Sequence, residues 1–334
     1  MNKNFLLACF LLISTSLMPQ QFKNDSIKDF IDKSIELIRL NSIHTENLDL
    51  IKSELYNRSK DVQSLDQVAP FYKEVFKDLN DHHGSLKYKG KTYGWDKALA
   101  ASNPYLKNKI KSEDKVVSTL IDKRFAYIRI PGNNDFAFKK VDSIANDIVS
   151  HINNINSNKI KGWIIDLRLN TGGNMYPILL GLKEFIGNDI AFGGFRDSQN
   201  QPTGNWEIKA GKMIIDGVEL ERKLVLKRPI GNLPVVVLTS CYTASAGEMT
   251  AISFIGRDKT FIAGEATANY TTAVQGFNIN KVAGINLSTD YVVDRNQKVY
   301  KSNITPDIEV MGGDNLDNLD KDRKIIKAIQ LLKK

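Results

Sequence analysis

Apolar residues recur every three to four positions near the start of the chain, a spacing that places them on one face of a helix. Three such stripes predict helices between residues 25 and 80, the first of them capped by Asn24, Asp25 and Ser26. The stripes comprise Ile27, Phe30, Ile31, Ile35 and Ile38, then Leu48, Ile51 and Leu55, then Val68, Phe71, Tyr72, Val75, Phe76 and Leu79. Each stripe needs a packing partner, so we predict a small helical N-terminal domain over residues 21–85.

Residues 86–115 are polar and basic, contain Gly90, Gly94 and Pro104, and show no hydrophobic period, which predicts an irregular linker. From residue 116 onward, continuous apolar runs typical of buried strands alternate with helical stripes. The runs lie at 125–130, 163–167, 235–238 and 260–263, and helices are expected at 138–155, 176–186 and after Ser245. This order predicts an α/β core over residues 116–334, with a largely parallel sheet and crossover helices.

Two stretches of the core lack helical spacing. Residues 188–232 carry turn signals at 201–204 and at Asp216–Gly217, which predicts hairpins. Residues 272–293 are predicted to form further strands that line a cleft. A helix over residues 321–332 is expected to close the core.

The first 20 residues have the layout of a signal peptide. Lys3 supplies a positive charge, residues 5–12 are apolar, and the small residues 14–16 suit cleavage. The apolar run is too short to cross a membrane, and Cys9 lies inside it rather than after it as in a lipoprotein signal. We therefore predict export to the periplasm or the cell exterior. Cys241 would then be the single cysteine, which cannot form an internal disulfide.

Composition and residue spacing exclude only a few classes of function. The chain of 334 residues is 42% hydrophobic and 25% charged, as in ordinary globular proteins, and its formal net charge is +8. Because its lysines are spread out without interleaved aromatic residues, we expect no nucleic-acid partner. The four histidines lack metal-site spacing, and no phosphate-binding glycine loop is present, so the sequence predicts no metal and no cofactor.

The candidate chemistry lies where apolar runs end. Ser245 follows the run at 235–238 and a loop of small residues, and it precedes a helical pattern. A serine there can be a nucleophile, with backbone N–H groups of the helix start holding an oxyanion, or it can simply cap the helix. Gly172 and Gly173 follow another buried run and allow either a plain tight turn or a close approach of the backbone to a ligand.

Together these stretches resemble the motifs of the tail-specific, or C-terminal processing, family of serine peptidases. The matching residues are Asp166, Leu167, Arg168, Asn170, Gly172 and Gly173, then Thr243, Ala244, Ser245, Ala246, Gly247 and Glu248, then Gly264, Glu265 and Thr267. The resemblance implies a ClpP/crotonase-like core, Ser245 as nucleophile, and an oxyanion hole formed by Ala246 with Gly172 or Gly173. A PDZ domain, common in this family, needs more strands than residues 86–115 can supply, so none is expected.

The residue expected to act as general base differs from that of one branch of this family. The bacterial tail-specific branch uses a lysine shortly after the third motif, where this chain has Tyr270. The branch that resembles the core of tricorn protease uses an upstream histidine, and residues 79–85 resemble the pattern that carries it, which indicates His83. Histidine titrates near neutral pH and can accept a proton from a serine hydroxyl.

The acid that orients the histidine in this family is also missing from its expected position. In the tricorn-like branch a glutamate is expected six residues before Pro306, and this chain has Tyr300 there. Asp81, Asp290 or Asp294 could take its place, and the sequence does not distinguish among them.

The resemblance implies an exported serine endopeptidase that hydrolyses peptide bonds through an acyl-enzyme. Shielding of the cleft by the helical domain, or by formation of a homo-oligomer, would restrict its substrates to short peptides or unfolded proteins. Two alternatives stay open: a weak or inactive family member that binds peptides or an apolar ligand, and an envelope esterase or amidase that acts on non-peptide acyl groups.

Overall fold

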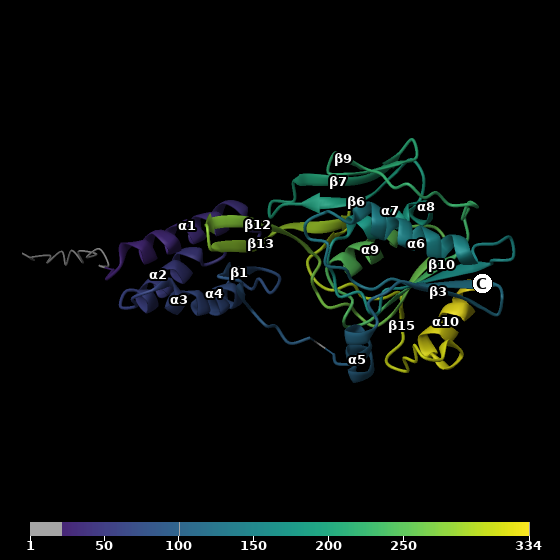
Figure 1. Cartoon of the computed structure of the whole chain (residues 1–334), viewed down its shortest axis with the longest axis horizontal. Helices are drawn as coiled ribbons and strands as arrows, with labels where there is room; N and C mark the ends of the chain where they lie inside the picture. Colours follow the sequence, from purple (N-terminus) through teal and green to yellow (C-terminus); the bar gives the residue numbers. More distant parts are fainter. Residues whose placement is uncertain (1–21, 100, 334) are drawn as a thin grey trace, which may run out of the picture.

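A helical part and a larger α/β part lie side by side in the computed structural model, which describes residues 22–99 and 101–333 (Figure 1). The predicted signal peptide falls outside the described residues. Within those residues, no helix combines the length and the apolar character that a membrane crossing requires.

The described core is built around a six-stranded sheet with the order β15-β11-β10-β5-β4-β3. Its strands are β3 (Val117–Ile121), β4 (Phe125–Arg129), β5 (Gly162–Asp166), β10 (Val235–Thr239), β11 (Thr260–Gly264) and β15 (Ile308–Glu309). All neighbours are parallel except the β3–β4 pair. The mixed α/β core with a largely parallel sheet is therefore confirmed.

Helices cover both faces of this sheet. Alternate residues of β10 face opposite ways, so Val235 and Val237 pack with α6 (Val141–Ile155), α7 (Tyr176–Gly181), α8 (Lys183–Ile186) and α9 (Ala246–Phe254), whereas Val236 and Leu238 pack with α10 (Arg323–Leu332). The helix α6 begins at Val141 rather than at the predicted Phe138, because Phe138 has a φ of 57° and cannot join a right-handed helix.

A second, antiparallel sheet connects the two parts of the molecule. Its order is β2-β1-β13-β6-β7-β8-β9, and β12 and β14 also pair with β13. The strands are β1 (Ser85–Tyr88), β2 (Lys91–Gly94), β6 (Ile190–Arg196), β7 (Pro202–Lys209), β8 (Lys212–Ile215), β9 (Val218–Leu220), β12 (Thr272–Asn280), β13 (Ala283–Asp294) and β14 (Val299–Tyr300). The predicted hairpins between residues 188 and 232 are thus confirmed by β6 to β9. The first turn lies at 197–201 rather than at the predicted 201–204, because Pro202 already begins β7.

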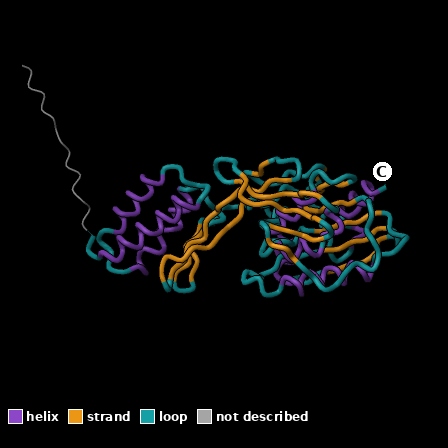
Figure 2. The backbone as a smooth tube through the Cα atoms, turned by 90° about the horizontal axis from the view of Figure 1, so that it is seen from above, coloured by secondary structure: helices purple, strands orange, loops and turns teal. Residues whose placement is uncertain are grey.

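The β12–β13 hairpin runs out of the core and reaches the helical part (Figure 2). There its apolar residues Ile279, Ile285 and Leu287 pack with the predicted helical stripes. These stripes form α1 (Asp25–Asn41), α2 (Leu48–Ser59), α3 (Leu65–Val68), the 3₁₀ turn η1 (Ala69–Phe71) and α4 (Tyr72–Asp78). The third stripe is divided at Pro70, since proline lacks the N–H that a continuous helix needs there.

Residues 86–115 carry more regular structure than the predicted irregular linker. The strands β1 and β2 form a hairpin there, and α5 (Pro104–Ser112) follows. In β1, Ser85 pairs with Asn286 of β13, a partner about two hundred residues away in the sequence. Such distant pairing leaves no local hydrophobic period, which explains why the pattern predicted a linker.

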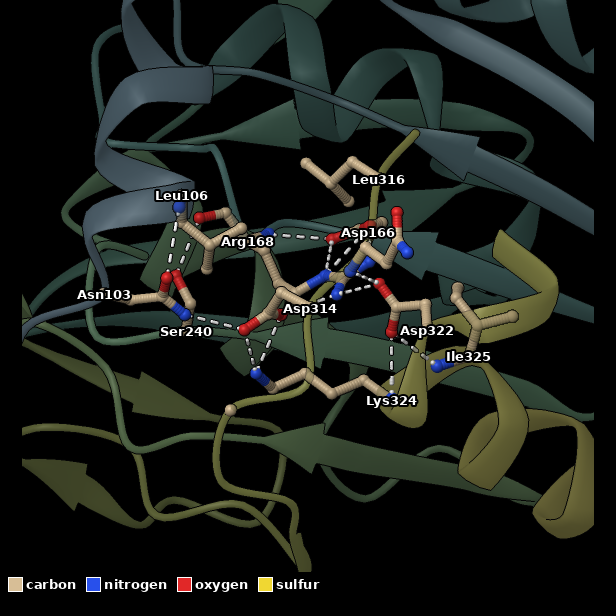
Figure 3. Close-up of polar contacts among 12 residues, drawn as sticks. Asn103, Leu106, Asp166, Arg168, Ser240, Asp314, Leu316, Asp322, Lys324 and Ile325 are labelled. Atoms are coloured by element: carbon tan, nitrogen blue, oxygen red, sulfur yellow. Dashed lines mark hydrogen bonds and ion pairs between the residues drawn. The ribbon is translucent and has the colours of Figure 1, made fainter. Parts of the chain in front are cut away.

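An ion network of buried side chains fastens the C-terminal segment to the ends of the parallel strands (Figure 3). Arg168, which follows β5, bonds to Asp166, Asp314 and Asp322, each at 2.7 Å. Lys324 of α10 adds contacts of 2.8 Å to Asp314 and to Glu265, which follows β11. Burial alone would raise the pKa of Asp166, but the adjacent Arg168 outweighs it and holds that pKa below its usual range.

Replacing Arg168 should destabilise the core strongly. In Arg168→Leu the three carboxylates would stay buried without their common partner, so we expect the free energy of unfolding to fall by about 3–5 kcal/mol, measured by urea denaturation. The matched control is Arg39→Leu, because Arg39 pairs with Asp49 at 2.6 Å on an exposed surface, where such a pair contributes little. Equal losses in the two variants would contradict this role of the network.

Candidate active site

Ser245 lies at the start of α9 in a backbone conformation that favours glycine. Its φ and ψ are 51° and −114°, values that cost a non-glycine residue on the order of 1–3 kcal/mol. The Glu248 carboxylate, three residues on, accepts the Ser245 N–H at 3.0 Å and holds this turn. Ala246 is the first residue of α9, where N–H groups have no partner within the helix.

Glu248 joins this turn to the loop that follows β11. Its carboxylate also accepts the backbone N–H of Tyr270 at 2.7 Å and of Asn269 at 3.1 Å, together with the Thr267 hydroxyl. Burial raises the pKa of Glu248 to about 7, although its four donors oppose that change. The motif that contains Glu248 did not reveal this role, although its position three residues after a helix cap is a signal for it.

The two glycines differ in what their N–H groups do. Gly172 lies against Ser245, since a Cβ at Gly172 would be 3.0 Å from that of Ser245. The Gly172 N–H already donates to Oδ1 of Asn170 at 3.1 Å. In the described part of the chain the Gly173 N–H has no hydrogen-bond partner. Gly173 has a φ of 115°, and a Cβ there would lie 1.7 Å from the Asn133 carbonyl oxygen, so no other residue fits.

His83 lies in the loop between α4 and β1, and its ring nitrogen Nδ1 contacts the hairpin. Its Nδ1 is 2.9 Å from the Thr272 hydroxyl of β12. That hydroxyl lies 3.2 Å from the hydroxyl of Ser288 on β13, and the Ser288 hydroxyl donates to Asp81 at 2.7 Å. Two hydroxyl side chains therefore connect the imidazole to the buried carboxylate of Asp81. Thr272 and Ser288 were missed by sequence reasoning, and no sequence motif marked them.

Asp81 shapes the loop that carries His83. It accepts the backbone N–H groups of His83 at 3.1 Å, Gly84 at 2.8 Å and Ser288 at 3.2 Å. A Cβ at Gly84 would lie 2.5 Å from the Asp81 carboxylate, so this close turn requires glycine.

The other acids that the sequence left open lie elsewhere. Asp294 accepts the hydroxyl of Tyr300 at 2.9 Å, and Asp290 accepts the hydroxyl of Thr203. Neither of these two carboxylates contacts His83. Of the three candidates, Asp81 is the one in the hydrogen-bond network of the histidine.

Tyr270 stands where one branch of the family has its lysine, and it contacts both His83 and Glu248. Its ring packs edge-on against His83 with the ring centres 5.0 Å apart, while its N–H donates to Glu248. Among the described residues no hydrogen bond joins His83 directly to Ser245.

A cavity of about 440 Å³ opens beside His83 and is lined by residues of both parts, including Asp81, Thr272, Ser288 and Tyr291. Nowhere in the described ranges do three or more acidic, histidine or cysteine side chains form a group that could hold a metal ion.

Comparison with known proteins identifies the class of this chain. The model of "Peptidase family S41" matches residues 124–310, more than half of the chain, and the chain therefore belongs to this peptidase family. The similarity to tail-specific and C-terminal processing peptidases is thereby confirmed.

Three known proteins are similar to this chain. The nisin-resistance protein of Lactococcus lactis subsp. lactis is 26% identical over 261 residues, which are 77% of this chain and 74% of that protein. A lipoprotein from Streptococcus agalactiae has a similar structure, with a TM-score of 0.66 at 21% identity, over 95% of this chain and 98% of that one. The photosystem II D1 C-terminal processing protease gives a TM-score of 0.58 at 12% identity, over 89% and 96% of the two chains. The two structural matches show a shared fold.

The environment of His83 predicts an unusual titration. Burial lowers its pKa from 6.5 to about 4, and the nearby Asp81 offsets only part of that effect. As the pH falls below 6.5, His83 takes up a proton in the unfolded chain but stays neutral in the folded one. The free energy of unfolding should therefore be highest above pH 6.5 and fall as the pH approaches 4. In histidine NMR spectra, the resonance absent from His83→Gln should titrate near pH 4. A midpoint at 6.5 would show that the ring is not buried in solution.

Proposed function

We propose that this chain is a serine endopeptidase in which Ser245 is the nucleophile and His83 the general base. The observation that carries the proposal is the strained Ser245 turn, held by Glu248 at a helix start and in contact with Gly172. Strained backbone at such a junction exposes a nucleophilic hydroxyl, as in the nucleophile elbow of other hydrolases. Membership of a peptidase family supports peptide bonds as the substrate.

The hydrogen bonds of His83 leave Nε2 free to accept the proton of Ser245. With a proton on Nδ1, the imidazole donates to Thr272, the Thr272 hydroxyl donates to Ser288, and the Ser288 hydroxyl donates to Asp81. This direction leaves Nε2 as the acceptor, and Asp81 favours the imidazolium that forms when the Ser245 proton is taken up. The glutamate of the tricorn-like branch is thus replaced, in this proposal, by Asp81 acting through two hydroxyls.

The contact between His83 and Ser245 has to be completed when a substrate enters. The two residues belong to different parts of the molecule, and catalytic hydrogen bonds often tighten only in the substrate complex. A peptide in the cleft beside His83 would exclude water and bring the imidazole within reach of the hydroxyl. The acyl-enzyme would then form as the leaving amine takes the proton from His83.

We assign the oxyanion hole to the N–H groups of Gly173 and Ala246. The Gly172 N–H is occupied by Asn170, whereas those of Gly173 and of the first residue of α9 are available. Two such donors would stabilise the negative oxygen of the tetrahedral intermediate. Gly172 serves the site differently, because its missing side chain leaves room for Ser245.

The names of the relatives support a role in the cell envelope. One relative is called a nisin-resistance protein and another a lipoprotein, and the first 20 residues of this chain have the layout of a signal peptide. We propose an exported peptidase that acts on short peptides or unfolded proteins, since the cleft lies between two packed parts.

The proposal predicts that both residues are needed for turnover. With casein as the substrate, Ser245→Ala and His83→Ala should each lower kcat/KM by about 10³-fold or more. His151→Ala, on α6 and in contact with Ser118 rather than with the site, is the matched control and should keep wild-type activity.

Three results would contradict the proposal in different ways. If wild type and Ser245→Ala are equally inert and a fluorophosphonate labels neither, a peptide-binding role takes its place. Loss in Ser245→Ala alone would exclude His83 as the base. Rapid turnover of simple esters without turnover of any peptide would favour the esterase alternative.

A further inference from the structure

Two phenylalanine side chains project into solvent from the loop between β4 and α6. Phe136 is 74% exposed and Phe138 is 58% exposed, and the ring of Phe138 packs against that of Tyr176 with the ring centres 5.3 Å apart. We call Phe136, Phe138 and Tyr176 the aromatic rim. Grouped exposed aromatic residues are unfavourable in water and commonly mark a site of recognition.

The loop that carries the rim is held firmly. Asp135 is buried, and its carboxylate accepts the backbone N–H groups of Lys139 at 2.9 Å and Lys140 at 2.8 Å. Phe138 itself has a φ of 57°, a conformation that an aromatic residue adopts only when its surroundings impose it. The two rings are therefore presented by a fixed loop and need little ordering when a ligand binds.

The same loop is bonded to the glycine pair of the proposed oxyanion hole. The Asn133 N–H donates to the Gly172 carbonyl at 3.1 Å, and the Asn133 side chain donates to the Asn174 carbonyl at 2.8 Å. The Asn174 side chain returns a hydrogen bond of 3.2 Å to the Asp135 carbonyl. A Cβ at Gly132 would lie 2.7 Å from the Gly172 oxygen, so the two loops are in direct contact.

Sheet topology places these loops on one edge with Ser245. The strands β4, β5 and β10 are parallel and in register, with Arg129 beside Asp166 and Asp166 beside Leu238. The segment after β4 carries Phe136 and Phe138, the segment after β5 carries the glycine pair and Tyr176, and the segment after β10 carries Ser245. Ligands of α/β sheets bind at this carboxyl edge.

We propose that the aromatic rim is a substrate subsite that receives a bulky apolar side chain of the peptide close to the scissile bond. This inference rests on the proposed peptidase function and names a substrate class for it. The occupant is the substrate, because the loop that carries Phe136 and Phe138 is bonded to Gly172, which lies against Ser245. Peptides with an aromatic or large aliphatic residue near the cleavage position bind more tightly than peptides with alanine there.

Binding to an inactive variant tests the subsite without requiring turnover. The probes are two fluorescein-labelled, unstructured peptides of Gly, Ser and Ala, identical except for a central Phe or Ala. Fluorescence anisotropy with Ser245→Ala should show tighter binding of the Phe peptide. Adding Phe136→Ala and Phe138→Ala should weaken the Phe peptide about tenfold and leave the Ala peptide unchanged. Val225→Ala, which removes a side chain that is 72% exposed on another loop, is the matched control and should change neither.

Two outcomes would overturn the subsite. The first is equal affinity for both peptides, or an equal effect of the rim substitutions on both. The second is a wild-type dimer in sedimentation experiments that the rim substitutions dissociate, which would make the rim an interface between copies of the chain. A wild type that turns over no peptide, while its Ser245→Ala form still binds the Phe peptide through the rim, would remove the peptidase function and leave the binding site.

Discussion

The pairing of β13 with strands of both parts is the constraint on which the proposed site depends. One end of this strand pairs with β1, so that Ser85 lies beside Asn286, and the other end pairs with β6, so that Tyr291 lies beside Arg196. His83 stands two residues before β1. A shift of one residue in this register would turn Ser288 to the opposite face and break its bond to Asp81. The histidine is therefore placed by backbone pairing across the whole sheet.

The serine side of the site depends on buried polar groups beneath the loops at the carboxyl edge. Glu248 bonds both the Ser245 turn and the Tyr270 loop, while the Arg168 network fixes the segment between β5 and the glycine pair. The Ser240 hydroxyl donates to the Arg168 carbonyl at 2.7 Å, which connects that network to the loop preceding Ser245. Two polar networks thus hold in place a turn that is strained by itself.

The elements with strong local signals could be predicted from the sequence. The helical stripes of the N-terminal part, the buried strands β4, β5 and β10, and the junction at Ser245 follow from hydrophobic periodicity and from motifs that act within a few residues. Even there, the start of the helix over 138–155 is wrong, since α6 begins at Val141. The left-handed backbone of Phe138 results from the Asp135 hydrogen bonds, which no periodicity reveals.

Features that depend on distant partners could not be predicted. The contacts of Asp81 rest on Ser288, about two hundred residues later, and the choice among Asp81, Asp290 and Asp294 needed the register of β13. The difference between Gly172 and Gly173 likewise depends on where the Asn170 side chain points. Tyr300 occupies the expected place of an acid, and its hydroxyl instead bonds Asp294, a contact that no motif encodes.

The central claim is that a histidine held by Thr272 on the hairpin activates a serine of the core. The rate at which a fluorophosphonate acylates Ser245 measures that activation without any assumption about the natural substrate. We expect rapid labelling of the wild type, slower labelling of Thr272→Val, in which the acceptor for His83 is lost, and near-background labelling of His83→Ala. Labelling at the wild-type rate in His83→Ala would contradict this claim, because Ser245 would then be activated by another group.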